Sequence, residues 1–150
     1  MKKVFVLIAL ITATAIVLLT ACATSNQEEK SQTATNSIMG TWQLNLYKYG
    51  SGTSTFTESS ANIGIIKLIT DTHFTWVHFD KTTKKVFSSA GGTYTLTGNI
   101  YTESIDFGLG MDSYLGNKPA YTIKVEGDML FLSGDLTEGF KIEEVWQRIR

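Results

Sequence analysis

Residues 92–107 read GTYTLTGNIYTESIDF, and this stretch decides the fold. Small polar residues alternate with larger side chains on both sides of Gly98-Asn99. An alternation with period two predicts strands that bury one face, and Gly98-Asn99 suits a two-residue turn with positive φ. The stretch therefore predicts an antiparallel hairpin. The expected cross-strand pairs are Leu96 with Tyr101 and Tyr94 with Glu103.

One face of this hairpin is apolar apart from a single carboxylate, Glu103. The other face carries threonine and serine and is expected to meet solvent. A carboxylate in an apolar interior must be paired or protonated, because desolvating a lone charge costs several kcal/mol. Glu103 is therefore the residue that needs an explanation. The expected inner row is Tyr94, Leu96, Tyr101, Glu103, Ile105 and Phe107.

Short strands continue on both sides of the hairpin, from Ile38 to Arg150. They are rich in β-branched and aromatic residues and are separated by Gly, Asn and Asp. Up to ten strands in so short a chain predict an all-β, antiparallel up-and-down barrel of about 8–10 strands, because closure removes exposed edges. The stretch Gly108–Asn117 breaks the pattern and is expected to hold a helical turn or a loop over one mouth. The strands are expected near Gly40–Tyr49, Thr53–Glu58, Ile63–Thr70, His73–Phe79, Lys85–Ser89, Gly92–Thr97, Tyr101–Phe107, Ala120–Glu126, Met129–Leu136 and Phe140–Ile149.

Two further turns assign faces to the last three strands. Gly127-Asp128 suits a two-residue turn that pairs Val125 with Leu130 and Ile123 with Leu132, with Phe131 as an apolar exception on the outer face. The turn at residues 137–139 is open to two interpretations. A three-residue loop with Gly139 in the left-handed region turns one row inward, and a two-residue loop would turn Glu144 and Arg148 outward instead. We favour the first, whose inner row is Leu136, Phe140, Ile142, Glu144, Trp146 and Arg148.

The N-terminus has the pattern of a secretory signal peptide at residues 1–21. Lys2-Lys3 precedes an uncharged apolar run from Val4 to Ala21. A run of this length also suits a membrane-spanning anchor. The sequence Leu19-Thr20-Ala21-Cys22 at its end decides between the two, because it resembles a bacterial lipobox. That resemblance implies that Cys22 carries a lipid and becomes the mature N-terminus.

Residues 22–37 are expected to form a flexible tether, since they are rich in Ser, Thr, Asn and Gln and contain no large apolar side chain. Residues 38–150 form the barrel domain. We expect a lipid-anchored protein of the cell envelope, in contact with membrane lipid through Cys22. Ala23, where some diderm bacteria use Asp as a retention signal, favours the outer membrane.

Composition excludes several classes of function. Thirteen basic residues against fourteen acidic ones give a net charge of −1, which argues against nucleic acid as a partner. The single cysteine excludes an internal disulfide. His73 and His78 point to opposite sides of a straight strand, so we expect no metal site and no cofactor. No nucleophile elbow, zinc motif or phosphate loop is present, so no catalytic residue is assigned. Gly91-Gly92 is interpreted as a bulge or bend.

The two ends of the barrel resemble the lipocalin and fatty-acid-binding superfamily. Gly40-Thr41-Trp42 opens the first strand, and Arg148 lies in the last one. In that superfamily such a Trp and Arg meet and close the bottom of the barrel, where the guanidinium covers the indole face. The absence of a two-helix lid after the first strand favours a lipocalin-like variant.

Several longer segments resemble a group of uncharacterised bacterial lipocalin-like lipoproteins. The resemblance spans about residues 38–150 and implies a barrel and an envelope location. It supplies no established ligand or catalytic residue. The segments are residues 72–77, 91–96, 101–103 and 141–146.

The candidate ligand cavity is the inward-facing polar and aromatic set His78, Trp76, Tyr94, Tyr101, Glu103 and Glu144. His78 is expected to share its face with Phe74 and Trp76. In one interpretation Glu144 and Arg148 form a structural pair at the closed end. In the other, Glu103 and His78 line a cavity and orient a small amphipathic ligand.

Three functions follow from these residues. The first is non-catalytic binding of a small apolar or amphipathic molecule. The second is an assembly or protein-interaction role with a filled barrel as scaffold, for which the sequence names no partner. The third is an enzyme such as an isomerase, with His78 and Glu103 as acid and base.

Overall fold

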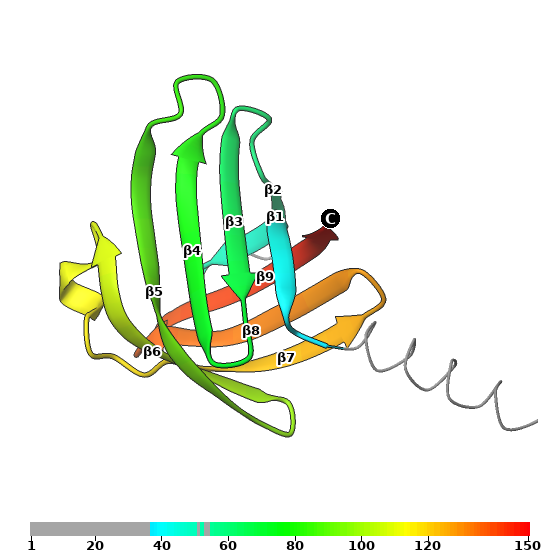
Figure 1. Cartoon of the computed structure of the whole chain (residues 1–150), viewed down its shortest axis with the longest axis vertical. Coiled ribbons are helices and arrows are strands. Elements are labelled where there is room, and N and C mark those ends of the chain that lie inside the picture. The colour runs from blue at the N-terminus through cyan, green and yellow to red at the C-terminus, as the bar shows by residue number, and fades with distance from the viewer. Residues whose placement is uncertain (1–36, 51, 53–54) are drawn as a thin grey trace, which may run out of the picture. The chain divides into compact units, whose positions relative to one another are not determined.

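Eight antiparallel strands close on themselves in the computed structural model, which describes residues 37–50, 52 and 55–150. The strand order is β1-β3-β4-β5-β6-β7-β8-β9, and β9 returns to pair with β1. The two-residue β2 pairs with β1 beside β3. Figure 1 shows β3, β4 and β5 as neighbours, with β7, β8 and β9 crossing behind them. The strands are β1 Gly40–Tyr49, β2 Thr57–Glu58, β3 Ile63–Ile69, β4 His73–Asp80, β5 Val86–Thr97, β6 Ile100–Leu109, β7 Ala120–Glu126, β8 Met129–Thr137 and β9 Phe140–Ile149.

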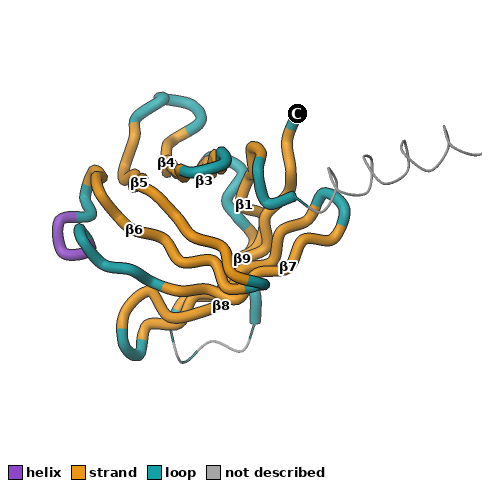
Figure 2. The backbone as a smooth tube through the Cα atoms, turned by 60° about the horizontal axis from the view of Figure 1, so that its bottom comes forward, coloured by secondary structure: helices purple, strands orange, loops and turns teal. Residues whose placement is uncertain are grey.

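The barrel belongs to a unit that covers residues 37–150. The signal peptide predicted for residues 1–21 lies outside the described residues. The predicted lipidated Cys22 and tether, residues 22–37, also lie outside them except for Ser37. Between β6 and β7 a 3-10 turn, η1, covers Asp112–Tyr114, as the broken pattern there predicted (Figure 2). Within the described part of the chain, no helix is long and apolar enough to cross a membrane.

The hairpin registers agree with the sequence. Leu96 pairs with Tyr101 and Tyr94 with Glu103 in the β5–β6 hairpin. Val125 pairs with Leu130 and Ile123 with Leu132 in the β7–β8 hairpin. The two-residue turns with Gly at their first position therefore set the register of both hairpins, which is a local property of the chain.

Two expectations about β5 and β6 were wrong, and one was confirmed. The strands expected at Lys85–Ser89 and Gly92–Thr97 are one continuous strand, β5. The bulge expected near Gly91-Gly92 is confirmed, but its extra residue is Asp106 on β6. Because a bulge reverses the alternation, Phe107 turns outward and is 57% exposed. Leu96 pairs with the buried Tyr101 and shares its face as expected, but it is exposed because it lies near the tip of the hairpin.

Gly92 permits the close approach of β5 and β6 at this bulge. A Cβ atom at this position would overlap the backbone carbonyl of Ser104 and lie 2.8 Å from Asp106 Oδ2. Asp106 uses that carboxylate to accept hydrogen bonds from the Thr93 amide and the Ser104 hydroxyl. Only glycine leaves room for the bulged residue to satisfy its neighbours.

The loop between β8 and β9 has two residues, Glu138 and Gly139, rather than the three expected. The inner row is nevertheless the one we favoured, because Leu136 is an extra, bulged residue before the loop. Ile142, Glu144 and Trp146 are all buried. A bulge plus a short loop therefore has the same effect on the alternation as a longer loop.

The first and last strands close one end of the barrel, as the resemblance implied. Trp42 is fully buried, and the Arg148 guanidinium carbon lies 4.0 Å from the centre of its ring system. Arg148 donates hydrogen bonds to the carbonyls of Ser37 and Met39. Gly40 has a φ of +144°, and a Cβ there would lie 2.5 Å from Arg148 Nη1. The glycine therefore makes room for the guanidinium that covers the tryptophan.

Candidate functional site

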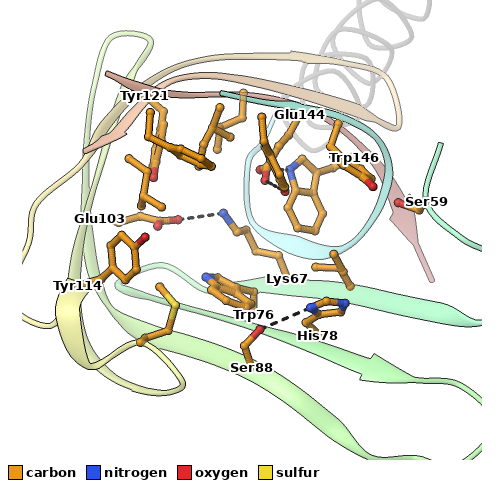
Figure 3. Close-up of a pocket in the computed structure, with 18 of the residues that line it drawn as sticks. Ser59, Lys67, Trp76, His78, Ser88, Glu103, Tyr114, Tyr121, Glu144 and Trp146 are labelled. Atoms are coloured by element: carbon orange, nitrogen blue, oxygen red, sulfur yellow. Dashed lines mark hydrogen bonds and ion pairs between the residues drawn. The ribbon is translucent and has the colours of Figure 1, made fainter. Parts of the chain in front are cut away.

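A cavity of about 510 Å³ occupies the half of the barrel away from Trp42 and Arg148. This volume falls in the range of pockets that hold small molecules. Its walls come from β1, β3–β9, η1 and the segment before β3 (Figure 3). The barrel is therefore hollow at one end and filled at the other. The lining residues are Tyr47, Tyr49, Ser59, Ser60, Ile63, Ile65, Lys67, Trp76, His78, Ser88, Glu103, Ile105, Met111, Tyr114, Tyr121, Leu132, Leu136, Phe140, Ile142, Glu144 and Trp146.

A buried ion pair lies at the level where the cavity meets the packed core. Lys67 Nζ lies 2.9 Å from Glu103 Oε1, and the two residues are 4% and 3% exposed. The ammonium also lies 5.2–5.9 Å from the centres of the Phe74, Tyr101 and Trp146 rings. Figure 3 shows Lys67 reaching across the cavity toward Glu103. A buried charge needs a partner of this kind, because neither group is solvated by water.

Glu144 is the second carboxylate of the cavity. The Tyr49 hydroxyl donates to its Oε1 at 2.6 Å, and the Trp146 indole nitrogen donates to its Oε2 at 2.9 Å. Burial raises the pKa of Glu144, while the charge of Lys67 and the two donated hydrogen bonds oppose that rise. Burial first, and the charge of Glu144 second, raise the pKa of Tyr49, so this tyrosine stays neutral. Glu144 is thus held by neutral donors rather than by a cation.

The expected pair between Glu144 and Arg148 does not form. Arg148 lies at the closed end, where it contacts Trp42, two backbone carbonyls and Asp128. Glu144 lies four residues earlier on β9, in the wall of the cavity. Two side chains on one face of a strand, four residues apart, are separated by about 13 Å along it. The distance along β9 therefore keeps the two charges apart.

Four of the six residues expected at the cavity line it: Trp76, His78, Glu103 and Glu144. Trp76 and His78 follow the inward alternation of β4, and the Ser88 hydroxyl lies 3.5 Å from His78 Nδ1. His73, on the other face of β4, is exposed. The sequence thus placed this strand correctly with respect to the interior.

The other two expected cavity residues, Tyr94 and Tyr101, instead pack between the ion pair and the closed end of the barrel. Their rings are 5.0 Å apart, and Tyr101 meets Phe74 edge to face. The Tyr94 hydroxyl donates to the backbone carbonyl of Thr70. Both residues face the interior as expected, but they lie near the β5–β6 turn at the closed end, where side chains fill the barrel.

The barrel fold of residues 37–150 agrees with the protein family and the solved structures to which the chain is similar. The model of the family described as "Domain of unknown function (DUF4488)" matches residues 37–150. The chain belongs to this family. Two solved structures share the fold of this DUF4488 domain. One is a lipocalin-like protein from Bacteroides uniformis, 18% identical with a TM-score of 0.53, and the match covers 75% of this chain and 98% of the other.

The second structure is an uncharacterized protein from Bacteroides eggerthii, 13% identical with a TM-score of 0.53. The match covers 75% of this chain and all of the other. No curated protein matches the chain. At these identities the two structures show the fold alone, which is an all-β, closed, lipocalin-like barrel.

Sequence reasoning missed Lys67, the partner of Glu103 in the DUF4488 barrel. Lys67 lies in the run Ile63–Ile69, where both faces of the strand are apolar, so alternation did not show which way it points. One signal was available. Glu103 required a cation, and Lys67 is the basic residue that lies within an otherwise apolar strand.

Tyr49 was missed for a different reason. Simple alternation from Trp42 and Leu44 would turn Leu46 and Lys48 inward. The register between β1 and β9 shifts between Leu44 and Leu46, so Asn45 is an extra residue. This bulge turns Tyr47 and Tyr49 into the cavity, where Tyr49 reaches Glu144.

Proposed function

We propose that this protein binds a small amphipathic molecule in its barrel without transforming it. The observation that carries the proposal is the cavity of about 510 Å³, which is mostly apolar and contains a few convergent polar groups. Sites for small molecules usually combine an apolar wall with a small number of placed polar groups. A filled scaffold, the alternative function, would leave no such space.

A binding role also fits the arrangement of the two groups considered as acid and base. Glu103 is held by Lys67, whereas His78 lies beside the hydroxyl of Ser88 on the other side of the cavity. Each has its own partner, and the two do not hydrogen-bond to each other. Because Glu103 is engaged by Lys67 rather than free to take a proton, this arrangement supports the binding role over the isomerase.

The proposal places the barrel in the cell envelope, held at the outer membrane by a lipid on Cys22. The support is the order of a basic start, an apolar run and Leu19-Thr20-Ala21-Cys22. We expect the wild-type chain to incorporate a palmitate analogue and to fractionate with membranes. A Cys22→Ala chain should do neither, and equal labelling of both chains would contradict the anchor.

The ligand-binding role is tested on residues 37–150, which contain every strand of the closed barrel. Native mass spectrometry and a fluorescent fatty-acid analogue should detect one bound molecule per barrel. Ile65→Trp places a large ring in the cavity wall and should abolish probe binding. Ile66→Trp, on the other face of the same strand, is the matched control and should bind normally. Equal binding by the two variants would place the probe outside the cavity.

A further inference from the structure

Acidic side chains outnumber lysine and arginine side chains in the cavity. Two carboxylates, Glu103 and Glu144, share the interior with one ammonium, Lys67. Lys67 forms its ion pair with Glu103, and in the part of the chain that the structure describes Glu144 has no basic partner within 4 Å. With all three groups ionised, the cavity therefore carries one negative charge in excess.

Glu144, which carries the excess negative charge, is the most accessible of the three charged side chains. Glu144 keeps 9% of its surface accessible, whereas Glu103 and Lys67 keep 3% and 4%. Figure 3 shows Glu144 beside Trp146 in the cavity wall. The Tyr49 hydroxyl and the Trp146 indole nitrogen donate one hydrogen bond to each carboxylate oxygen. Both donors are neutral, so they leave the negative charge of Glu144 available to a ligand cation.

The walls around Glu144 suit a cation as well. Tyr47, Tyr49, Trp76, Tyr121 and Trp146 all line the cavity. Aromatic faces attract ammonium groups, above all where water is excluded. Burial raises the pKa of Tyr49 and of Tyr121, so these rings remain neutral and add no competing charge. Aromatic walls around a carboxylate that has no cationic partner are the features that recognise organic ammonium ions.

We infer that the cavity binds an organic cation, an ammonium group carried on an apolar skeleton, with the charge at Glu144 and the skeleton against the aromatic walls. This inference rests on the proposed ligand-binding function and names its ligand class. A cation brings the interior to neutrality. An anionic ligand such as a fatty-acid carboxylate would instead place a third negative charge beside one ammonium, which a low-dielectric interior penalises.

The test compares three probes with one alkyl chain on residues 37–150 by isothermal titration calorimetry. The probes are decyltrimethylammonium, decanol and decanoate, each below its critical micelle concentration. We expect decyltrimethylammonium to bind about tenfold more tightly than decanol, and decanoate to bind more weakly than either. This comparison uses the unaltered barrel, so it does not depend on how a variant folds.

Two adjacent glutamates supply a matched pair of variants. Glu144→Gln should lower the affinity for decyltrimethylammonium to that for decanol and leave decanol unchanged. Glu143→Gln, whose side chain pairs with Lys48 and Lys141 on the outside of the barrel, should keep the preference for the cation. A Glu144→Gln barrel that still prefers the cation would overturn the role of Glu144.

The outcomes separate this inference from the proposed function. Binding of decanol or decanoate as tight as that of the cation overturns the inference and leaves a ligand-binding barrel. Failure of all three probes to bind overturns the inference and counts against the proposed function too. Tighter binding of the cation, lost in Glu144→Gln and kept in Glu143→Gln, supports both.

Discussion

The two ends of this barrel are built from the same strands but follow different physical rules. At the closed end Trp42 is fully buried, Arg148 covers its ring, and the guanidinium satisfies two backbone carbonyls. At the open end large side chains line a hollow, and carboxylates, hydroxyls and an ammonium face the interior. The buried pair of Lys67 and Glu103 lies between them. One end is organised for stability, whereas the other retains polar groups at a cost in stability.

This difference shows that a buried side chain contributes differently to stability at the two ends of one barrel. A side chain at the closed end has packed neighbours on all sides, so its removal leaves a void. A side chain at the open end already faces empty space, so its removal mainly enlarges the cavity. Substitutions of the same chemical type at the two ends should therefore have unequal effects.

The largest expected effect comes from a pair of tryptophans. Trp42→Ala should lower the free energy of unfolding by about 3–5 kcal/mol, because it opens a void in a filled region and removes the surface under Arg148. Trp76→Ala, in the cavity wall, should cost about 1–2 kcal/mol. Urea denaturation of both variants measures the two values. Equal losses would show that the ends do not differ in packing.

The second-largest loss of stability is expected at the Lys67–Glu103 ion pair, which lies between the two ends of the barrel. Lys67→Met should destabilise the barrel by about 3 kcal/mol, because it leaves Glu103 buried without a cation. Adding Glu103→Gln to Lys67→Met should recover much of that loss, since the remaining groups are neutral. A double-mutant cycle by urea denaturation measures the coupling. If the two losses simply add, the pair contributes no coupling.

The smallest effect is a pH dependence with opposite signs at two adjacent residues. Burial raises the pKa of Glu144 above its ordinary value of 4.5. The folded state then holds the proton more tightly than the unfolded chain does. This contribution to stability is present below pH 4.5 and is lost as the pH rises through the folded-state value. At neutral pH, Glu144→Gln should therefore be more stable than the wild type, with the difference shrinking in acid.

Glu143 should show the reverse behaviour. Hydrogen bonds from Lys48, and then from Lys141, lower the pKa of this carboxyl. Its contribution to stability is present above pH 4.5 and is lost as the pH falls through the lower, folded-state value. Glu143→Gln should therefore be slightly less stable than the wild type at neutral pH. Denaturation curves at several pH values compare the variants, and slopes of the same sign would contradict the assignment of the two environments.

Local patterns were sufficient for much of this fold. The Gly98-Asn99 turn set one hairpin register. The closed end at Trp42 and Arg148 was instead implied by the resemblance to the lipocalin superfamily. The inward position of Glu103 also followed from the register. The inferences about the hairpin register and Glu103 succeed because a two-residue turn and a period-two alternation act over a few residues.

The composition of the site depended on features that alternation does not encode. Bulges at Asn45 and Asp106 reversed the alternation, so Tyr49 entered the cavity and Phe107 left it. Each bulge depends on how two strands fit across the sheet rather than on the residues of one strand. A one-residue shift moves every later side chain to the other face.

By itself, the sequence determined a closed antiparallel barrel, the registers of its tight hairpins and the presence of one carboxylate, Glu103, on an apolar face. The Trp42–Arg148 closure was implied by the resemblance to lipocalins. Only the tertiary structure decided that Lys67 neutralises Glu103 and that Tyr49 holds Glu144. The members of these pairs lie 36 and 95 residues apart in the chain. Turn and alternation preferences act within a strand or a hairpin, whereas these two contacts depend on which strands lie beside or opposite each other once the barrel has closed.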